Sequence, residues 1–386
     1  MKNIFRSYLY GYLNEYNNYK SFLDTPDNKS YKKFKVKKVS EYFKIPIGFI
    51  HIFSKIIQFL SIIEIPISLA IISYNFIKYT LILLCTQKIK IQHAKLMLGL
   101  NSNKITFDNM MKSVDLICEN IIIIKTPNVS FKYSNYKTIS IFSGLKFKDV
   151  TKAYVYAFKM VFFIKKKYHK RDFFFRSYSS FEYFVAYFFV TESDKTNEYY
   201  FHSLIDRYSC LFGGIEHKTY FIQHGIINDQ LKMRKIGKAD YAYFIDKKQK
   251  EICEKILFKN IPVAYYRKPI NIDSTEKILK NGFKNILLIC NLLFFDKEKD
   301  IIENLKDKKI NLYVKPHPRD KNAHYENLQL NNKFILLETT DYIKADIVIS
   351  YVSTLATEYE NNGILVLRHS DNSFQYDFDQ TFELNN

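Results

Sequence analysis

The chain has 386 residues, of which 47% are hydrophobic and 17% aromatic, with only 10 glycines and 8 prolines. This composition excludes a disordered protein, and the length suits two domains better than one compact core. Five scattered cysteines without a Cys-x-x-Cys pair indicate reduced thiols in a cytoplasmic protein and no disulfide framework. The nine histidines show no metal-ligand spacing, so no metal site is expected.

The formal net charge of +19 at pH 7 favours an anionic partner, which can be nucleic acid, anionic lipid or an acidic substrate. No helix-turn-helix, zinc-finger or RNA-binding signature is present, so nucleic acid is not the expected partner. The sequence also lacks a G-x-G-x-x-G fingerprint and a P-loop lysine, which counts against dinucleotide oxidoreductases and P-loop NTPases.

Residues 1–78 form a basic and apolar region with helical character. Its densest basic run is Lys29 to Lys38, and its most apolar part starts at Ile45 and continues to Leu84. The stretch from Ile56 to Ile77 contains one charge, Glu64, and is long enough to cross a bilayer. Three interpretations remain open: buried core helices, a helix pair lying on an anionic inner-membrane surface, or a membrane span.

From residue 79 onward, short apolar runs alternate with helical patterns, which predicts an α/β protein with parallel, doubly wound sheets. We expect a first Rossmann-like domain over residues 79–265, a linker over 266–284 and a second Rossmann-like domain over 285–386, with a ligand cleft between them. Expected strands are 79–84, 120–124, 186–191, 218–222 and 241–245 in the first domain, and 285–290, 310–314, 334–337, 347–349 and 364–367 in the second. Expected helices are 204–211, 247–257 and 296–306.

A Lys315-Pro-His-Pro-Arg319 string follows the apolar run 310–314. The two prolines end strand pairing and stiffen the loop, which holds His317 between two cations at a strand end. Phosphates of nucleotides bind at this edge of open α/β sheets. We therefore expect Lys315, His317, Pro318 and Arg319 to bind a donor phosphate, the alternative being a surface turn with incidental charge.

Three hydroxyl residues, Ser350, Ser353 and Thr354, follow the apolar run 347–349 and precede a helical pattern. Hydroxyls at a helix N-terminus either cap the helix or, with the exposed N–H groups, make an anion site. Asn291, which follows the run 285–290, is expected to contact the donor through its backbone.

Candidate catalytic residues follow two runs of the first domain. Gln223-His224-Gly225 ends the strand expected at 218–222, and His224 is placed to orient or deprotonate an acceptor hydroxyl. Glu192 and Asp194 follow the strand expected at 186–191. An inverting transfer needs a base on the acceptor, and the candidates are Glu192, His224 and Asp194, in that order. A buried structural histidine and plain loop carboxylates are the alternatives.

Together, the Gln-His-Gly loop, the Lys-Pro-His-Pro string and the Ser-Tyr-Val-Ser-Thr strand end resemble bacterial GT-B glycosyltransferases of capsule and cell-surface polysaccharide synthesis. The nearest resemblance is to sialyl- and polysialyltransferases, with their His-Pro and Ser-Ser/Thr motifs. CDP-glycerol glycerophosphotransferases are also similar, having a His-Gly loop, a Pro-His-Pro string and a Ser-Ser strand end. In both groups the donor is a cytidine nucleotide. The resemblance places its phosphate against His317, Pro318, Ser353 and Thr354.

Two departures accompany this resemblance. The Asp/Glu-Asp/Glu-Gly motif that carries the base in many bacterial sialyltransferases is absent, so Glu192 stands in by position. The aspartate of the glycerophosphotransferase Thr-Asp-Tyr-Ser-Ser element is also missing, because Ser350-Tyr351 stands there.

The resemblance implies a GT-B fold with two facing Rossmann-like domains. It also implies an inverting, metal-independent glycosyltransferase without a cofactor, which moves a sialic-acid-type sugar from a CMP-activated donor to an acidic surface glycan. Such a protein would be cytoplasmic and peripheral to the inner membrane. The alternatives are a CDP-glycerol-type polyol-phosphate transferase and a non-catalytic polyanion- or membrane-binding subunit of a capsule assembly complex.

Overall fold

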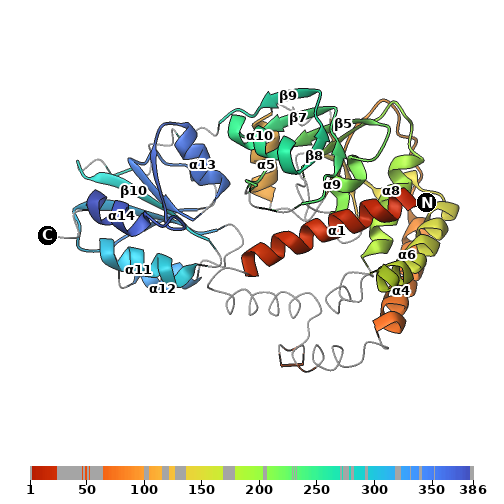
Figure 1. The fold of residues 1–386 in the computed structure, drawn as a ribbon, viewed down its shortest axis with the longest axis horizontal. Helices are drawn as coiled ribbons and strands as arrows, with labels where there is room; N and C mark the ends of the chain where they lie inside the picture. Colours follow the sequence, from red (N-terminus) through yellow and green to blue (C-terminus); the bar gives the residue numbers. More distant parts are fainter. Residues whose placement is uncertain are drawn as a thin grey trace. The chain divides into compact units, whose positions relative to one another are not determined.

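The fold is taken from a computed structural model, which divides the chain into two compact units (Figure 1). The first unit contains Met1–Ser102, Leu116–Gln223 and Ile227–Tyr265. The second contains Asn103–Asp115, His224–Ile226 and Tyr266–Asn386. The residues that the structure describes are 2–23, 46, 48–49, 52, 64–99, 104–114, 121–126, 136–167, 179–202, 207–227, 229, 231, 233–269, 272, 278–279, 282–291, 294–317, 323–330, 332–338, 341–351 and 353–382.

The sheet of the first unit has the strand order β3-β2-β1-β4-β5-β7-β9, and the paired strands from β3 to β7 are parallel. The order runs outward in both directions from the β1/β4 pair, which is the Rossmann arrangement with its switch point at that pair. The strands are β1 (Lys95–Gly99), β2 (Ile121–Lys125), β3 (Lys137–Ser140), β4 (Glu198–Phe201), β5 (Lys218–Ile222), β7 (Tyr241–Phe244) and β9 (Val263–Tyr266). A small separate sheet pairs β6 (Gly237–Lys238) with β8 (Phe258–Asn260).

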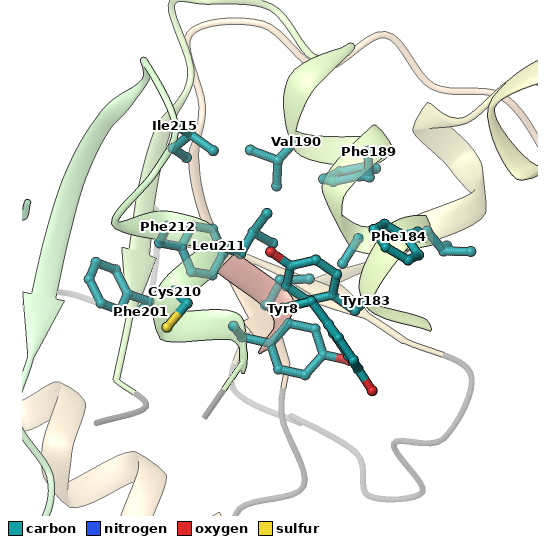
Figure 2. Packing of buried hydrophobic residues seen from close by; sticks show 14 of the residues in the cluster. Tyr8, Tyr183, Phe184, Phe189, Val190, Phe201, Cys210, Leu211, Phe212 and Ile215 are labelled. Atoms are coloured by element: carbon teal, nitrogen blue, oxygen red, sulfur yellow. The ribbon is translucent and has the colours of Figure 1, made fainter. Parts of the chain in front are cut away.

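Helices of the first unit bury one large aromatic core against this sheet. They are α1 (Lys2–Leu23), α4 (Glu64–Cys85), α6 (Phe147–Lys167), α8 (Ser180–Thr191), α9 (Arg207–Phe212) and α10 (Lys247–Ile256), with a 3₁₀ turn at Ile141–Gly144. Figure 2 shows Tyr8 of α1 among Tyr183 and Phe184 of α8 and Leu211 of α9. The rings of Tyr8 and Tyr183 meet edge to face at 5.1 Å. The start of the basic N-terminal region is therefore part of this core.

Two expected strands of the first unit are wrong. The runs 79–84 and 186–191 lie in α4 and α8. α8 buries nine of its twelve residues, so it has no polar face and its apolar run carries no helical period. The strands expected near 120–124, 218–222 and 241–245 and the helix near 247–257 are confirmed as β2, β5, β7 and α10.

The second unit repeats the Rossmann order with a five-stranded parallel sheet, β12-β11-β10-β13-β14. Its strands are β10 (Lys284–Ile289), β11 (Ile310–Lys315), β12 (Ile335–Leu336), β13 (Ile347–Ser350) and β14 (Leu365–Arg368). Its helices are α5 (Lys104–Lys112), α11 (Phe295–Leu305), α12 (Ala323–Gln329), α13 (Thr354–Asn361) and α14 (Phe374–Phe382). All five expected strands and the helix expected at 296–306 are confirmed.

Both faces of the second sheet are covered. Residues that alternate along its strands face two separate clusters, because successive side chains of a strand point to opposite faces. Leu288 and Val314 lie with α11, α12 and α14, whereas Leu287 and Tyr313 lie with α13 (Figure 1). The expected α/β class with two Rossmann-like, doubly wound units is therefore confirmed.

Candidate functional site

The carboxyl edge of the second sheet brings together four loops, each following a strand. Backbone hydrogen bonds continue the sheet past the strand ends. The N–H of Cys290 donates to the carbonyl of Lys315 at 2.9 Å, and the N–H of His369 donates to the carbonyl of Ser350 at 2.9 Å. From β11 to β14 the edge therefore presents Pro316-His317, Cys290-Asn291, Ser350-Tyr351 and His369. The switch point of the sheet falls between β10 and β13, where ligands bind in open α/β sheets.

His317 and the Ser353 loop lie on either side of this switch point. β11 and β13 both pair with β10, so their ends are two strand spacings apart, or roughly 10 Å. Pro316 is buried and His317 half-buried, which anchors the histidine where β11 ends. Pro318 and Arg319 lie outside the described residues. The structure thus places His317 and the hydroxyl loop at one sheet edge, as the sequence predicts.

Lys315 has a structural task that the sequence analysis did not foresee. The residue is buried, and its ammonium donates to the carbonyls of Glu338 at 2.9 Å and Asp341 at 2.5 Å. It also lies 4.6 Å from the centre of the Tyr342 ring, a cation–π contact. The ammonium therefore holds the loop after β12, and this placement corrects its expected role as a phosphate ligand.

Ser353 caps α13. Its side-chain oxygen accepts from Ala356 N–H at 3.0 Å, and its backbone is extended, as at an N-cap. Ser350 Oγ lies 3.3 Å from Ser353 Oγ and donates to the Ile289 carbonyl at 3.1 Å. Both hydroxyls thus fix the N-terminus of α13 against β10. Thr354 is the first residue of α13, so the N-terminus of this helix lies at the carboxyl edge of the sheet.

The His224-Gly225 loop belongs to this edge. Residues His224–Ile226 group with the second unit, and Thr354 Oγ1 donates to the His224 carbonyl at 3.5 Å. Both His224 and Gly225 are half-buried. The structure therefore brings His224 and Thr354 side by side, although they are far apart in sequence.

Gln223 serves as the anchor of that loop. Its side chain is fully buried, donates to Gln249 Oε1 at 2.7 Å and accepts from Ile245 N–H at 3.3 Å. Gln249 in turn accepts from Ile227 N–H at 2.9 Å. The buried amide pair thus joins Gln223 and Ile227, the residues that flank the His224 loop in the chain.

A buried cluster behind this edge was not predicted. Glu298, in the first turn of α11, has no exposed surface and accepts from Asn291 N–H at 2.7 Å and from the Tyr325 hydroxyl at 2.5 Å. The carboxylate therefore accepts from the backbone N–H through which Asn291 is expected to contact the donor, and this corrects that expectation. His369 Nε2 lies 3.8 Å from the same carboxylate. The only sequence signal for this cluster is a charged residue in the first turn of a helix that follows a buried strand.

An aromatic pair lies beside the switch point. Phe294, before α11, and Tyr351, after β13, stack with ring centres 4.1 Å apart. His369 contacts both rings, at 5.7 and 5.5 Å. The pair brings the segments that follow β10 and β13 together at the carboxyl edge of the sheet.

The imidazole of His369 is neutral at pH 7. Burial, and then the Lys297 ammonium, lower its pKa from 6.5 to about 4, in spite of the Glu298 carboxylate nearby. The unfolded chain binds a proton at this residue below pH 6.5, whereas the folded chain does so only below about pH 4.

Stability is therefore expected to fall with decreasing pH between 6.5 and 4, by up to about 1.4 kcal/mol per pH unit from this residue. In His369→Phe that contribution disappears, and the phenyl ring keeps the aromatic contacts. Urea unfolding of both proteins across this pH range measures the difference. Parallel stability curves for the two proteins would rule out a depressed pKa at His369.

Glu192 and Asp194 are not at a strand's carboxyl end, and the position predicted for them is wrong. They follow α8 and lead into β4, at the edge where strands begin: Asn197 Oδ1 accepts from Ala94 N–H, just before β1, at 3.0 Å. Glu192 pairs with Lys152 at 3.3 Å. This edge of the sheet is opposite to the one from which the Gln223 loop emerges.

Asp194 also carries the wrong chemistry for a base. Hydrogen bonds from the backbone and hydroxyl of Thr196, and then from Gln92, lower its pKa to about 2. A carboxylate this acidic is a poor proton acceptor near neutral pH. His202, which directly follows β4, occupies the strand-end position that the sequence analysis gave to Glu192, and it is buried.

Over the described residues, no group of three or more His, Cys, Asp or Glu side chains is arranged to hold a metal ion. The described cysteines are not joined by disulfides: Cys85, Cys210, Cys253 and Cys290.

These features define an α/β protein with two Rossmann-order sheets and a polar, histidine-bearing edge on the second. No family model matches the chain, and no curated protein does. Among solved structures, the chain is similar to the wall teichoic acid polymerase TagF, in an H444N variant soaked with CDPG. The identity is 12% and the TM-score 0.39, with 75% of this chain and 72% of that chain covered.

Proposed function

We propose that the protein is a metal-independent, inverting transferase that moves a unit from a cytidine-nucleotide donor to a hydroxyl group of a cell-surface polymer. One observation carries the proposal. The carboxyl edge of the second Rossmann-order sheet gathers His317, Asn291, the N-terminus of α13 and the His224-Gly225 loop around one switch point. This is the position at which open α/β sheets bind nucleotides.

In this proposal the donor phosphates lie against the edge between β11 and β13. The N–H groups in the first turn of α13 donate to phosphate oxygens, while the Thr354 hydroxyl donates to the His224 carbonyl. His317 donates to the same phosphate from the β11 side. Negative charge that develops on the departing nucleotide is thereby stabilised by donors whose positions are fixed by the sheet.

His224 acts as the base in the proposed reaction. It removes the proton of the acceptor hydroxyl as that oxygen attacks the activated centre of the donor. The bond between that centre and the nucleotide breaks, and its electron pair leaves with the nucleotide phosphate. An acidic acceptor would suit the net charge of +19.

Two donor classes fit this scheme, and CMP is the leaving group in both. With a CMP-activated sialic-acid-type sugar, attack at the sugar carbon releases CMP. With a CDP-glycerol-type donor, attack at the distal phosphorus also releases CMP. The contact between Thr354 and His224 favours the second class, because the His-Gly loop is part of the motif set of the glycerophosphotransferases.

Donor consumption tests the proposal. The purified protein is incubated with CMP-sialic acid or with CDP-glycerol, with and without a membrane extract as acceptor source, and CMP release is measured. We expect CMP to be released from only one of the two donors. The membrane extract should change the rate of release, whereas the metal chelator EDTA should not. If neither donor releases CMP while the protein still binds polyanions or membranes, the transferase proposal fails. The protein would then be a non-catalytic polyanion- or membrane-binding subunit.

A further inference from the structure

The outer side of α4 carries an apolar stripe. The window Ile65–Cys85 has a mean hydropathy of 1.7, yet only 22% of it is buried. The inner side, with Tyr79 and Leu83, belongs to the core of the first unit. Outward-facing residues recur at intervals of three and four, and they are 59–73% exposed: Tyr74, Ile77, Leu81 and Leu84. Apolar side chains that follow one side of a helix in this way indicate a surface that is covered in use.

The packing of α4 argues against a membrane span. Tyr79 donates a hydrogen bond to Glu182 of α8 at 2.9 Å, and Ser73 Oγ lies 3.1 Å from the Tyr154 hydroxyl of α6. Phe76 also packs on Tyr154, at 4.6 Å between ring centres. One side of the helix is thus fixed to the folded unit by polar and aromatic contacts, so lipid could reach only the other side.

Lysines accompany this stripe. α6, which packs beside α4, has an exposed row at intervals of three and four residues that mixes cations with apolar side chains: Lys148, Lys152, Val155, Lys159 and Phe162. Lys78 is exposed on α4 itself, and Lys88 and Lys90 follow the helix. Between Ile65 and Cys85 the sequence has no acidic residue. Apolar side chains flanked by lysines match an anionic bilayer surface, which offers hydrocarbon below its charged headgroups.

We propose that this outer α4–α6 face, made of Tyr74, Ile77, Leu81 and Leu84 of α4 with Lys148, Lys152, Val155, Lys159 and Phe162 of α6, docks on the surface of an anionic membrane. α4 lies in the plane of the interface with its outer stripe among the headgroups and upper acyl chains. Lys148 and Lys159 of α6 contact the lipid phosphates, whereas Lys152 is paired with Glu192. The inference does not depend on the proposed transferase activity, because it rests only on the exposure and charge of the first unit.

Vesicle binding by the full chain tests the docking face. Sedimentation is measured with phosphatidylcholine vesicles and with vesicles that also contain phosphatidylglycerol. We expect binding to the anionic vesicles that weakens with salt. The variant Ile77→Glu/Leu81→Glu should reduce the partition coefficient roughly tenfold or more, because two apolar contacts are replaced by charges that the anionic surface repels. Lys148→Gln/Lys159→Gln should reduce it roughly tenfold, and by less at high salt.

Leu330→Glu is the matched control, since Leu330 is 83% exposed but lies in the second unit. This variant should bind vesicles as the unchanged protein does. Thermal unfolding of every variant shows whether its fold is kept. If the unchanged protein ignores anionic vesicles, or if all variants bind equally, the proposal fails. A concentration-dependent dimer that Ile77→Glu/Leu81→Glu abolishes, without vesicle binding, would assign the face to a second copy of the chain.

Discussion

Replacing His317 by alanine is expected to lower turnover by about a hundredfold, which is the usual cost of removing one preorganised donor from a developing negative charge. Stability should change little, because the imidazole is half-buried in a loop and not in the core. The prediction concerns CMP release under saturating donor, so the loss should appear in kcat more than in KM.

The reason lies in what surrounds His317. Pro316 is buried and ends β11, so the loop that carries the histidine is held rigidly at the edge of the sheet. The neighbouring Lys315 ammonium already donates to the carbonyls of Glu338 and Asp341. The Lys315 ammonium is therefore engaged by these two carbonyls, whereas His317 is the described residue of the Lys-Pro-His-Pro-Arg string that follows β11 directly at the carboxyl edge of the sheet.

A matched control and a conservative variant sharpen this test. His93 is an exposed histidine of the first unit that lies before β1, at the edge where strands begin. His93→Ala should leave turnover within about twofold, as surface changes away from a site usually do. His317→Gln keeps an N–H donor and should recover part of the lost rate. Full turnover in a folded His317→Ala protein would remove this residue from the mechanism.

The second sheet could be predicted because its signals are local. Each of its strands is a short apolar run between breaks in the pattern, and prolines or hydroxyl residues mark the ends of β11 and β13. Proline geometry and helix capping act over a few residues, so they can be read from the chain alone. The placement of His317, Ser353 and Thr354 directly after strands could be predicted in this way.

The two errors have a common cause, which is the absence of a polar side. The run 186–191 is apolar because α8 is buried on nearly all sides, and the run 79–84 is apolar because α4 adds an exposed apolar stripe to its core side, so neither run shows whether it is a helix or a strand. The error at α8 carried Glu192 and Asp194 to the wrong edge of the sheet. β4, which was missed together with β1, β3 and β9, has the sequence Glu-Tyr-Tyr-Phe, and it places His202 at the carboxyl edge instead.

Contacts between segments that are distant in the sequence could not be predicted from the sequence. The Glu298–His369 approach joins α11 to the end of β14, and Arg267 lies in the expected linker 266–284 although it is buried. The residues that neighbour Glu298 or Arg267 in the sequence carry no signal that identifies the partner of either side chain. Such pairs can be assigned only when the topology has brought their elements together.

Removing either partner of the buried Arg267–Glu358 pair is expected to destabilise the second unit by about 3–5 kcal/mol. Arg267 Nη2 lies 3.4 Å from Glu358 Oε1 on α13, and Arg267 Nε donates to Ser113 Oγ at 2.7 Å. Their side chains are only 6% and 9% exposed. Burial lowers the pKa of Arg267, and the Glu358 carboxylate opposes that effect. Loss of one partner therefore leaves a buried charge without its counterion.

Urea unfolding of Arg267→Met, Glu358→Leu and the double variant separates the pair's own contribution from the cost of an orphaned charge. The double variant should be less destabilised than the sum of the single variants, because no unpaired charge remains. Lys299→Met provides the control: the Lys299–Glu303 pair on α11 has a similar separation, 3.5 Å, but is about half exposed. It should cost less than about 1 kcal/mol.

Equal, small effects at both pairs would mean that Arg267 is solvated. A large destabilisation at the Arg267–Glu358 pair, with a small one at the Lys299–Glu303 pair, would establish that the segment carrying Arg267, which follows β9, is fixed to α13. Because the N-terminus of α13 is the proposed phosphate site, that anchor would then support the donor-binding edge from behind.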